Sequence, residues 1–230
     1  MSADGMKYAP RGKVEPVVER GAFGVGVVGL DHGHIYGMTH GLEDAGAVIR
    51  TVYDPDPDKL AEFREQFPET PVAPSIEAVL EREDIALVAS AAVPADRGPL
   101  GLRVLDHGKH YVSDKAPFTT LDQLEDARRK VAETGLIWSV CYSERLQNES
   151  AVYAGRLIRD GAIGAVLQVI GLGPHRLNAQ NRPHWFWKRE RYGGILIDIG
   201  SHQVEQCLYY AGADDARVLR TKIANYRHPE

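Results

Sequence analysis

The sequence predicts an α/β protein whose N-terminal part is a doubly wound parallel sheet. From residue 22 to residue 142, apolar runs of strand length alternate with segments of helical periodicity. The run Ile85–Ala92 is continuously apolar, as expected for a strand that is buried on both faces. Strands that alternate with helices require crossover connections, and these produce a mostly parallel sheet covered by helices on both sides.

The predicted elements follow in order along this part. A first strand at Ala22–Leu30 leads to a helix near Ile35–Ala45, and a second strand at Val48–Tyr53 ends at a proline-rich turn. The remaining elements are helices at Leu60–Phe67 and Ile76–Leu80, the strand Ile85–Ala92, a helix that buries Leu100, Val104 and Leu105 and stops at Gly108, a strand at Tyr111-Val112, a helix at Leu121–Glu133 with a capping box at Thr120 and Gln123, and a strand at Leu136–Tyr142.

The pattern changes after Tyr142, and three segments are expected: a flexible leader at residues 1–20, the sheet domain at 21–142, and a thin α+β domain at 143–230. Its predicted elements are a helix at Ala151–Arg159, a strand at Val166–Leu172, an aromatic and basic loop at His184–Tyr192, a helix at Val204–Tyr210 and a strand at Val218–Tyr226. Two strands are few for a sheet that is stable alone.

Composition excludes several classes of protein. Of 230 residues, 43% are hydrophobic and 26% charged, which is typical of a globular protein. The net charge of −5, with acidic and basic residues interspersed, argues against nucleic acid or an anionic membrane as the main partner. The sequence contains neither a membrane-spanning apolar stretch nor a signal peptide, so we expect a cytoplasmic protein. Cys141 and Cys207 are expected as small buried hydrophobic residues.

The first strand is followed by a candidate dinucleotide-binding turn. The literal match Gly24-x-Gly26-x-x-Gly29 lies inside the strand, so the turn in the correct register is Gly29-Leu30-Asp31-His32-Gly33-His34. It keeps the first glycine of the fingerprint and replaces the other two by Asp31 and His34. We expect all six residues of this turn to contact the cofactor.

An acidic residue follows the second strand where such domains bind the adenosine ribose. Asp54 lies 25 positions after Gly29, and a carboxylate there accepts from ribose hydroxyls and repels a 2′-phosphate. We therefore expect NAD, with NADP less favoured. The alternative for Asp54 is a turn residue before proline. His32 and His34 could also bracket a metal ion, but no acid or cysteine lies nearby at ligand spacing, so no metal is expected.

Three residues form a candidate acid–base group: Lys115, at the end of a strand, and Asp198 and His202, after the pair Gly193-Gly194. Oxidation of an alcohol requires a base for the hydroxyl proton, and histidine titrates near neutral pH. We expect His202 to be this base, on a helix start capped by Ser201. Lys115 would stabilise an alkoxide, and Asp198 would orient the substrate or the imidazole. The alternative is surface charges plus a core histidine.

Together these residues resemble the Gfo/Idh/MocA oxidoreductases, named after glucose–fructose oxidoreductase, inositol dehydrogenase and a rhizopine-catabolism protein. The resemblance runs from about Phe23 to the C-terminus and includes an intact Asp-x-x-x-His element at Asp198 and His202. The family's Glu-Lys-Pro signature is here Asp114-Lys115-Ala116. Its proline-asparagine-histidine stretch reads Val93-Pro94-Ala95-Asp96-Arg97, so Pro94 is expected near the nicotinamide.

The resemblance implies catalytic roles for Lys115, Asp198 and His202, and a second domain with an open, mostly antiparallel sheet that forms a homo-oligomer. It also implies hydride transfer between NAD(P) and a secondary alcohol of a sugar, cyclitol or related polyol. A lyase or glycosidase that acts through transient oxidation, and a non-catalytic NAD-binding regulator, remain open. His184, Trp185 and Trp187 are candidate substrate contacts, although these aromatic residues could equally serve packing.

Overall fold

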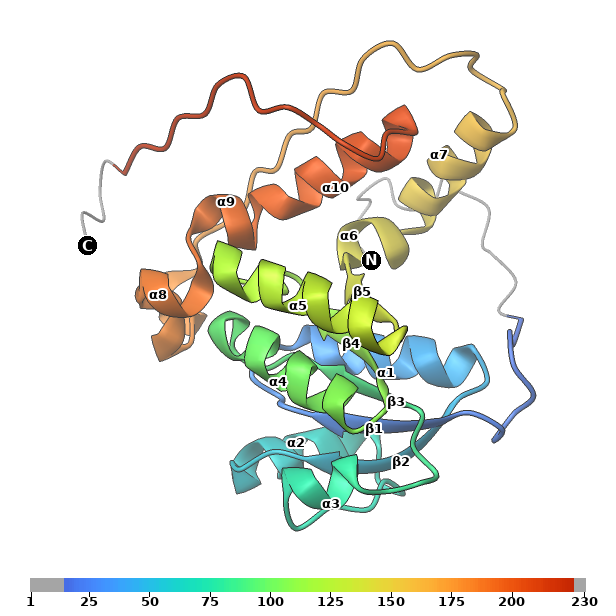
Figure 1. Cartoon of the computed structure of the whole chain (residues 1–230). Coiled ribbons are helices and arrows are strands. Elements are labelled where there is room, and N and C mark those ends of the chain that lie inside the picture. Colours follow the sequence, from blue (N-terminus) through green and yellow to red (C-terminus); the bar gives the residue numbers. More distant parts are fainter. Residues whose placement is uncertain (1–14, 226–230) are drawn as a thin grey trace.

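The computed structural model describes residues 15–225, and its centre is a five-stranded sheet in the order β2-β1-β3-β4-β5 (Figure 1). Every paired strand runs parallel to its neighbours, which confirms the predicted doubly wound sheet. The chain reverses its direction of winding between β1 and β3, so ligands are expected at the carboxyl ends of these strands. The strands are β1 (Gly24–Val28), β2 (Val48–Tyr53), β3 (Leu87–Ser90), β4 (His110–Asp114) and β5 (Trp138–Cys141).

Two apolar cores lie on the two faces of the sheet, because neighbouring residues of a strand point to opposite sides. Ala89 of β3 belongs to one core, with Ile35 and Phe63 from two helices. Val88, the preceding residue, belongs to the other core, which includes Leu100. The helices of this part are α1 (His34–Asp44), α2 (Pro57–Gln66), α3 (Ile76–Leu80), α4 (Pro94–Asp106) and α5 (Leu121–Thr134).

The second part of the chain is helical, and α10 lies beside α6, α7 and α9 (Figure 1). Arg191 reaches back to the first part, where its guanidinium binds the carboxylate of Asp96 on α4 at 2.9 and 2.6 Å. The aromatic loop contains short helical turns, and Phe186 is buried against Tyr192 with ring centroids 5.0 Å apart. The helices are α6 (Ser143–Leu146), α7 (Glu149–Arg159), η1 (Ala179–Asn181), η2 (His184–Trp187), α8 (Arg189–Tyr192), α9 (Ile195–Asp198) and α10 (Gly200–Ala211).

The antiparallel sheet expected in this part does not form in the described residues. The predicted strand Val166–Leu172 is an irregular segment, as is 218–225 of the second predicted strand, whose last residue, Tyr226, lies outside the described range. Both segments border a cavity of about 460 Å³ beside α10. A strand requires a hydrogen-bonded neighbour, and the described chain does not place another strand beside either segment. The apolar side chain of Leu167 is consequently 94% exposed.

Two helical glycines give a matched test of this packing. A Cβ at Gly101 of α4 would lie 2.2 Å from the ring of Trp138, whereas one at Gly41 of α1 would meet nothing within 4 Å. We expect Gly101→Ala to lower the free energy of unfolding by about 1–3 kcal/mol through overpacking. Gly41→Ala should raise it by up to about 1 kcal/mol, since alanine favours the helix. Urea unfolding measures both, and equal stability of the two variants would contradict the packing of α4 on β5.

Candidate active site

The turn after β1 is built for close approach of a ligand to the backbone. Gly29 has φ +80°, and a Cβ there would lie 2.8 Å from the Cβ of Ala92. Helix α1 then begins at His34 with Gly33 as its N-cap and without a side-chain cap. Its first N–H groups already donate within the turn, that of His34 to His32 Nδ1 at 3.3 Å and the next two to the carbonyl oxygens of His32 and Gly33.

Asp54 holds this turn in place. Its side chain is buried, and its carboxylate accepts from the backbone N–H of Leu30 at 2.7 Å and from that of Asp56 at 2.9 Å. Each carboxylate oxygen has a second lone pair that could accept from a ribose hydroxyl. The local turn role and the ligand role of Asp54 are thus compatible in this geometry.

A largely apolar cavity of about 380 Å³ opens beside Asp54 at the carboxyl ends of β1 and β2. Its apolar lining suits a heterocycle next to a carboxylate that can bind a sugar hydroxyl. The lining consists of Val28, Gly29, Asp31, Tyr53, Asp54, Pro55, Ile76, Ala92, Asp96, Pro99, Leu100 and Arg103.

Asp31, in the position of the second fingerprint glycine, is neutralised by its neighbours. Its carboxylate pairs with the amine of Lys59 at 2.7 Å and accepts from the backbone N–H of Val93 at 3.2 Å. The charge that would repel a phosphate is therefore balanced by a lysine from α2. Val93 directly precedes Pro94, so this contact also joins the turn to the start of α4.

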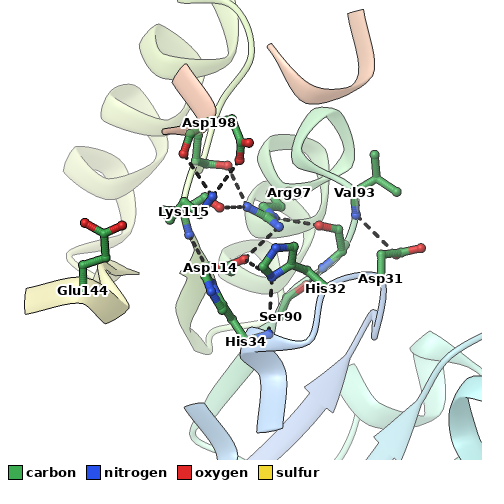
Figure 2. A network of polar contacts seen from close by, with 12 residues as sticks. Asp31, His32, His34, Ser90, Val93, Arg97, Asp114, Lys115, Glu144 and Asp198 are labelled. Atoms are coloured by element: carbon green, nitrogen blue, oxygen red, sulfur yellow. Dashed lines mark hydrogen bonds and ion pairs between the residues drawn. The ribbon is translucent and has the colours of Figure 1, made fainter. Parts of the chain in front are cut away.

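The carboxylate of Asp114 is the centre of a buried polar network (Figure 2). Asp114 is the last residue of β4 and is 0% exposed. Its oxygens contact His34 Nδ1 at 2.9 Å, His32 Nδ1 at 3.3 Å, Arg97 Nη2 at 3.1 Å and the backbone N–H of Lys115 at 2.8 Å.

These surroundings determine two pKa values. Burial alone would raise the pKa of Asp114, but the hydrogen bond from His34 and the charge of Arg97 outweigh it and lower that pKa to about 2. Burial lowers the pKa of His32 to about 4, although the charge of Asp114 opposes the shift. At neutral pH, Asp114 is an anion and His32 is uncharged.

The expectation that no acidic residue accompanies His32 and His34 is wrong. Asp114, 80 positions after His34, supplies an acidic partner, and the three side chains place ligand-type atoms within 4.8 Å of one another. Arg97, however, already neutralises this carboxylate. The guanidinium of Arg97 thus supplies, at 3.1 Å, positive charge of the kind that a metal ion would bring to this carboxylate.

Arg97 fixes the backbone around the candidate lysine. Its side chain is 1% exposed, and its guanidinium donates to the carbonyl oxygen of Ala92 at 2.7 Å, to that of Ala116 at 3.2 Å and to that of Lys115. The same group also pairs with Asp114. One buried cation thus joins the ends of β3 and β4 beneath the candidate site.

Lys115 and Asp198 form a buried ion pair between the two parts of the chain (Figure 2). The amine of Lys115 lies 2.6 Å from Asp198 Oδ1 and 3.0 Å from the Asp198 carbonyl oxygen. Both side chains are less than 10% exposed. The glycine pair before α9 has positive φ, +84° at Gly193 and +94° at Gly194, and this turn brings Asp198 to the lysine.

His202 follows Asp198 by one helical turn and is 2% exposed. Its Nδ1 has no hydrogen-bond partner among the described residues, and its Nε2 lies 3.9 Å from Glu144 Oε1. Burial lowers the pKa of His202, and the charge of Lys115 adds to this effect, while the charge of Glu144 opposes it. Neutral His202 therefore has a buried ring nitrogen without a partner among the described residues, and it lies within the electrostatic influence of Lys115.

The expected cap at Ser201 is wrong. Helix α10 begins at Gly200, and Ser201 Oγ is buried without a hydrogen-bond partner in the described part of the chain. The backbone N–H of Ile199 donates to Ile195, and that of His202 donates to Ile199. Because α10 continues from the preceding turn, its start does not depend on a side-chain cap.

The three proposed substrate residues lie in different surroundings. Trp185 lines a polar cavity of about 670 Å³, together with His32 and Gly33 of the dinucleotide turn. Trp187 is 42% exposed, and neither Trp187 nor His184 lines a described cavity. Among these three residues, Trp185 is therefore the one that the fold places beside the turn.

Two residues of the site were missed in the sequence. Arg97 lies three positions before Leu100 and seven before Val104, so it belongs to the buried face of α4, and this spacing could have identified it. Glu144 follows β5 by three residues, at the carboxyl edge of the sheet, where ligands bind. A search of every strand end would have found it.

Family models match both parts of the chain. The model for the oxidoreductase family with an NAD-binding Rossmann fold matches residues 22–142, and the model for the GFO/IDH/MocA C-terminal domain matches residues 152–229. The chain belongs to the Gfo/Idh/MocA oxidoreductase family. The family resemblance seen in the motifs is thereby confirmed.

Several members of the Gfo/Idh/MocA family are similar in sequence or structure. The scyllo-inositol 2-dehydrogenase (NADP(+)) IolW of Bacillus subtilis (strain 168) is 24% identical over 69% of this chain and 44% of its own length. The levoglucosan dehydrogenase of Pseudarthrobacter phenanthrenivorans is 22% identical over 85% of this chain and 54% of its own. A structure of a protein from Erwinia carotovora atroseptica SCRI1043, assigned as an oxidoreductase, superposes with a TM-score of 0.86, at 46% identity over 90% of this chain and 62% of that one.

This chain spans about half the length of the curated relatives it matches. A levoglucosan dehydrogenase in complex with NADH superposes with a TM-score of 0.71 at 20% identity, covering 83% of this chain, which shows the shared fold. No helix in residues 15–225 is both long and apolar enough to span a membrane.

The lowered pKa of His32 predicts how stability depends on pH. Between pH 6.5 and about 4, the unfolded chain binds a proton at His32 that the folded chain does not, so the free energy of unfolding falls as the pH falls. The full loss is on the order of 3 kcal/mol. His32→Asn should flatten this slope, as measured by urea unfolding at pH 4.5, 5.5 and 6.5. His40→Asn, which removes a half-exposed histidine, is the control. An unchanged slope in His32→Asn would contradict the buried, neutral state of His32.

Proposed function

We propose that this chain carries the reaction centre of an NAD-dependent oxidoreductase that transfers a hydride between the nicotinamide and a secondary alcohol of a sugar, cyclitol or related polyol. The observation that carries the proposal is the buried pair of Lys115 and Asp198 with neutral His202 one turn later. The group adjoins the carboxyl edge of a dinucleotide-binding sheet. The curated relatives named as inositol and levoglucosan dehydrogenases support the same class of reaction.

The residues present fit an adenine dinucleotide. The apolar cavity beside Tyr53 would take the adenine, and Asp54 would accept from the ribose hydroxyls. The turn after β1, which leads into α1, would adjoin the diphosphate, and Pro94 and Lys115 would adjoin the nicotinamide half. We favour NAD because a 2′-phosphate would meet the buried carboxylate of Asp54.

In alcohol oxidation, a dinucleotide held by these residues would supply the hydride acceptor for the carbon that carries the hydroxyl group. His202 would take the hydroxyl proton through its unpaired Nδ1, and the carbon would give up one hydride, which carries the two electrons of the C–H bond, so that the alcohol becomes a carbonyl group. Lys115 stabilises the negative charge that develops on the oxygen. Asp198 fixes the position of the Lys115 amine through the contact at 2.6 Å.

Glu144 suits the tautomer that this step requires. Its carboxylate lies on the Nε2 side of His202, at 3.9 Å, and favours a proton on that nitrogen. The lone pair of His202 is then on Nδ1. Because Glu144 is 37% exposed whereas His202 is 2% exposed, it also lies on a route for the proton toward solvent.

The substrate side of the proposal is coarser. Trp185, which lines the polar cavity beside the dinucleotide turn, would contact the apolar face of a polyol. We further propose that the enzyme works in the cytoplasm, without nucleic acid or membrane as a partner, and as a homo-oligomer through its C-terminal part. These features are consistent with its interspersed charges and exposed apolar segments.

The cofactor assignment is tested at Asp54. We expect Asp54→Ala to weaken NADH binding by about 1.5–3 kcal/mol, the contribution of hydrogen bonds to a charged group. Because Asp54 also holds Leu30 and Asp56, thermal unfolding must accompany the calorimetric titration. Asp56→Ala, which removes the cap of α2 on the same turn, is the matched control. Equal NADH affinity of the native chain and Asp54→Ala would contradict a ribose role.

The base is tested through the pH dependence of turnover. Since the pKa of His202 is lowered, the imidazole stays neutral below pH 6.5, and kcat/KM for oxidation should decline only below that value as the base becomes protonated. His202→Asn should lower kcat by about 10²–10⁴-fold and remove this decline. Formation of reduced cofactor with a polyol panel is the readout, and a near-normal rate in His202→Asn would exclude the proposed base.

The same assay separates the alternative functions. Polyol turnover without net cofactor reduction would favour a lyase or glycosidase that acts through transient oxidation, and cofactor binding without turnover would favour a regulator.

A further inference from the structure

The cavity of about 670 Å³ lies between the dinucleotide turn and a segment of the second part of the chain. One wall is residues 31–33, and the other is formed by residues from His175 to Trp185, more than 140 positions later. In folds of this kind the diphosphate of a dinucleotide binds at the turn after the first strand. The second wall therefore faces the place where this anion is expected under the proposed function.

Among the described residues, the positively charged side chains next to the turn are already paired with other groups. The amine of Lys59 is held by Asp31 at 2.7 Å, and the guanidinium of Arg97 is buried on Asp114 and on three carbonyl oxygens. Lys59 is thus used to balance the charge of Asp31, which stands where the fingerprint has glycine. Positive charge to match a dianionic group at this turn would come from outside the turn.

The opposite wall carries two arginines without an acidic partner in the described chain. Arg182 is held in place, because it donates to the carbonyl oxygen of Leu177 at 2.9 Å and its guanidinium lies 4.3 Å from the ring centroid of Phe186. Arg176 is exposed and forms no ion pair within residues 15–225. Guanidinium groups bind phosphate oxygens through paired hydrogen bonds, and uncompensated charges facing a cavity suit such a ligand.

We infer that Arg176 and Arg182 bind the diphosphate of the dinucleotide from across the cavity, as the cationic half of a site whose other half is the turn after β1. This inference rests on the proposed function for the presence of the dinucleotide. It adds that a segment of the second part of the chain contacts the cofactor directly. The amides of Asn178 and Asn181 in the same lining would add neutral donors.

The inference is tested by calorimetric titration with ADP and with adenosine, which differ by the diphosphate. In the native chain ADP should bind more tightly than adenosine, and its affinity should fall as the KCl concentration rises. Arg176→Gln should weaken ADP binding about tenfold or more and leave adenosine binding unchanged. Because Arg176 is exposed, this variant should fold as the native chain does, and thermal unfolding verifies that.

Arg128→Gln, on the exposed surface of α5, removes the same charge away from the cavity and is the control for net charge. Arg182→Lys, which keeps the charge and loses the guanidinium geometry, should weaken ADP binding less than Arg182→Gln. The inference is overturned if Arg176→Gln and Arg182→Gln bind ADP as the native chain does, or if Arg128→Gln loses as much affinity. If the native chain binds NADH but both variants bind ADP normally, the proposed function stands without this site. If the native chain binds neither ADP nor NADH, both proposals fail.

Discussion

The ion pair between Lys115 and Asp198 is the contact on which the candidate site depends. It joins the end of a strand in the first part to a short helix in the second, and both side chains are buried. A buried pair of this kind contributes little net stability, yet the loss of one partner leaves an uncompensated charge that costs about 3–5 kcal/mol. The ion pair therefore acts mainly by fixing the position of Lys115 relative to the helix that carries His202.

Beneath this pair, Arg97 and Asp114 form a rigid support. The guanidinium of Arg97 binds carbonyl oxygens on both sides of the lysine's strand end, and Asp114 orders His32 and His34 of the dinucleotide turn. The cofactor turn and the candidate lysine are thus positioned by one carboxylate. Such a network is fully effective only when each member is satisfied, and here each oxygen of Asp114 has a partner.

Much of the first part follows from local sequence patterns. The bounds of β2 and α3 match the predicted ranges, and the cap at Thr120 is confirmed by a hydrogen bond from the N–H of Gln123. The roles of Asp114 and Arg97 could not be read in this way, since their partners come from distant segments. The carboxylate beside Nε2 of His202 likewise comes from a distant residue, Glu144, 58 positions earlier.

The second part shows where local patterns fail. The β-branched run around Val166 favours a strand, but strand formation depends on a neighbour that the described chain does not provide. Its side chains instead border the cavity beside α10. The predicted antiparallel sheet is therefore not formed in the described residues, although the residues around Val166 are of types that favour strands.

Two ion pairs, one at the surface and one in the interior, join the two parts of the chain. Arg191 and Asp96 meet at the surface, with side chains 37% and 51% exposed, whereas Lys115 and Asp198 meet in the interior. Dissolved ions screen the outer pair and hardly reach the inner one. High ionic strength would therefore loosen the contact between Arg191 and Asp96 first, while the candidate catalytic residues Lys115 and Asp198 keep their alignment.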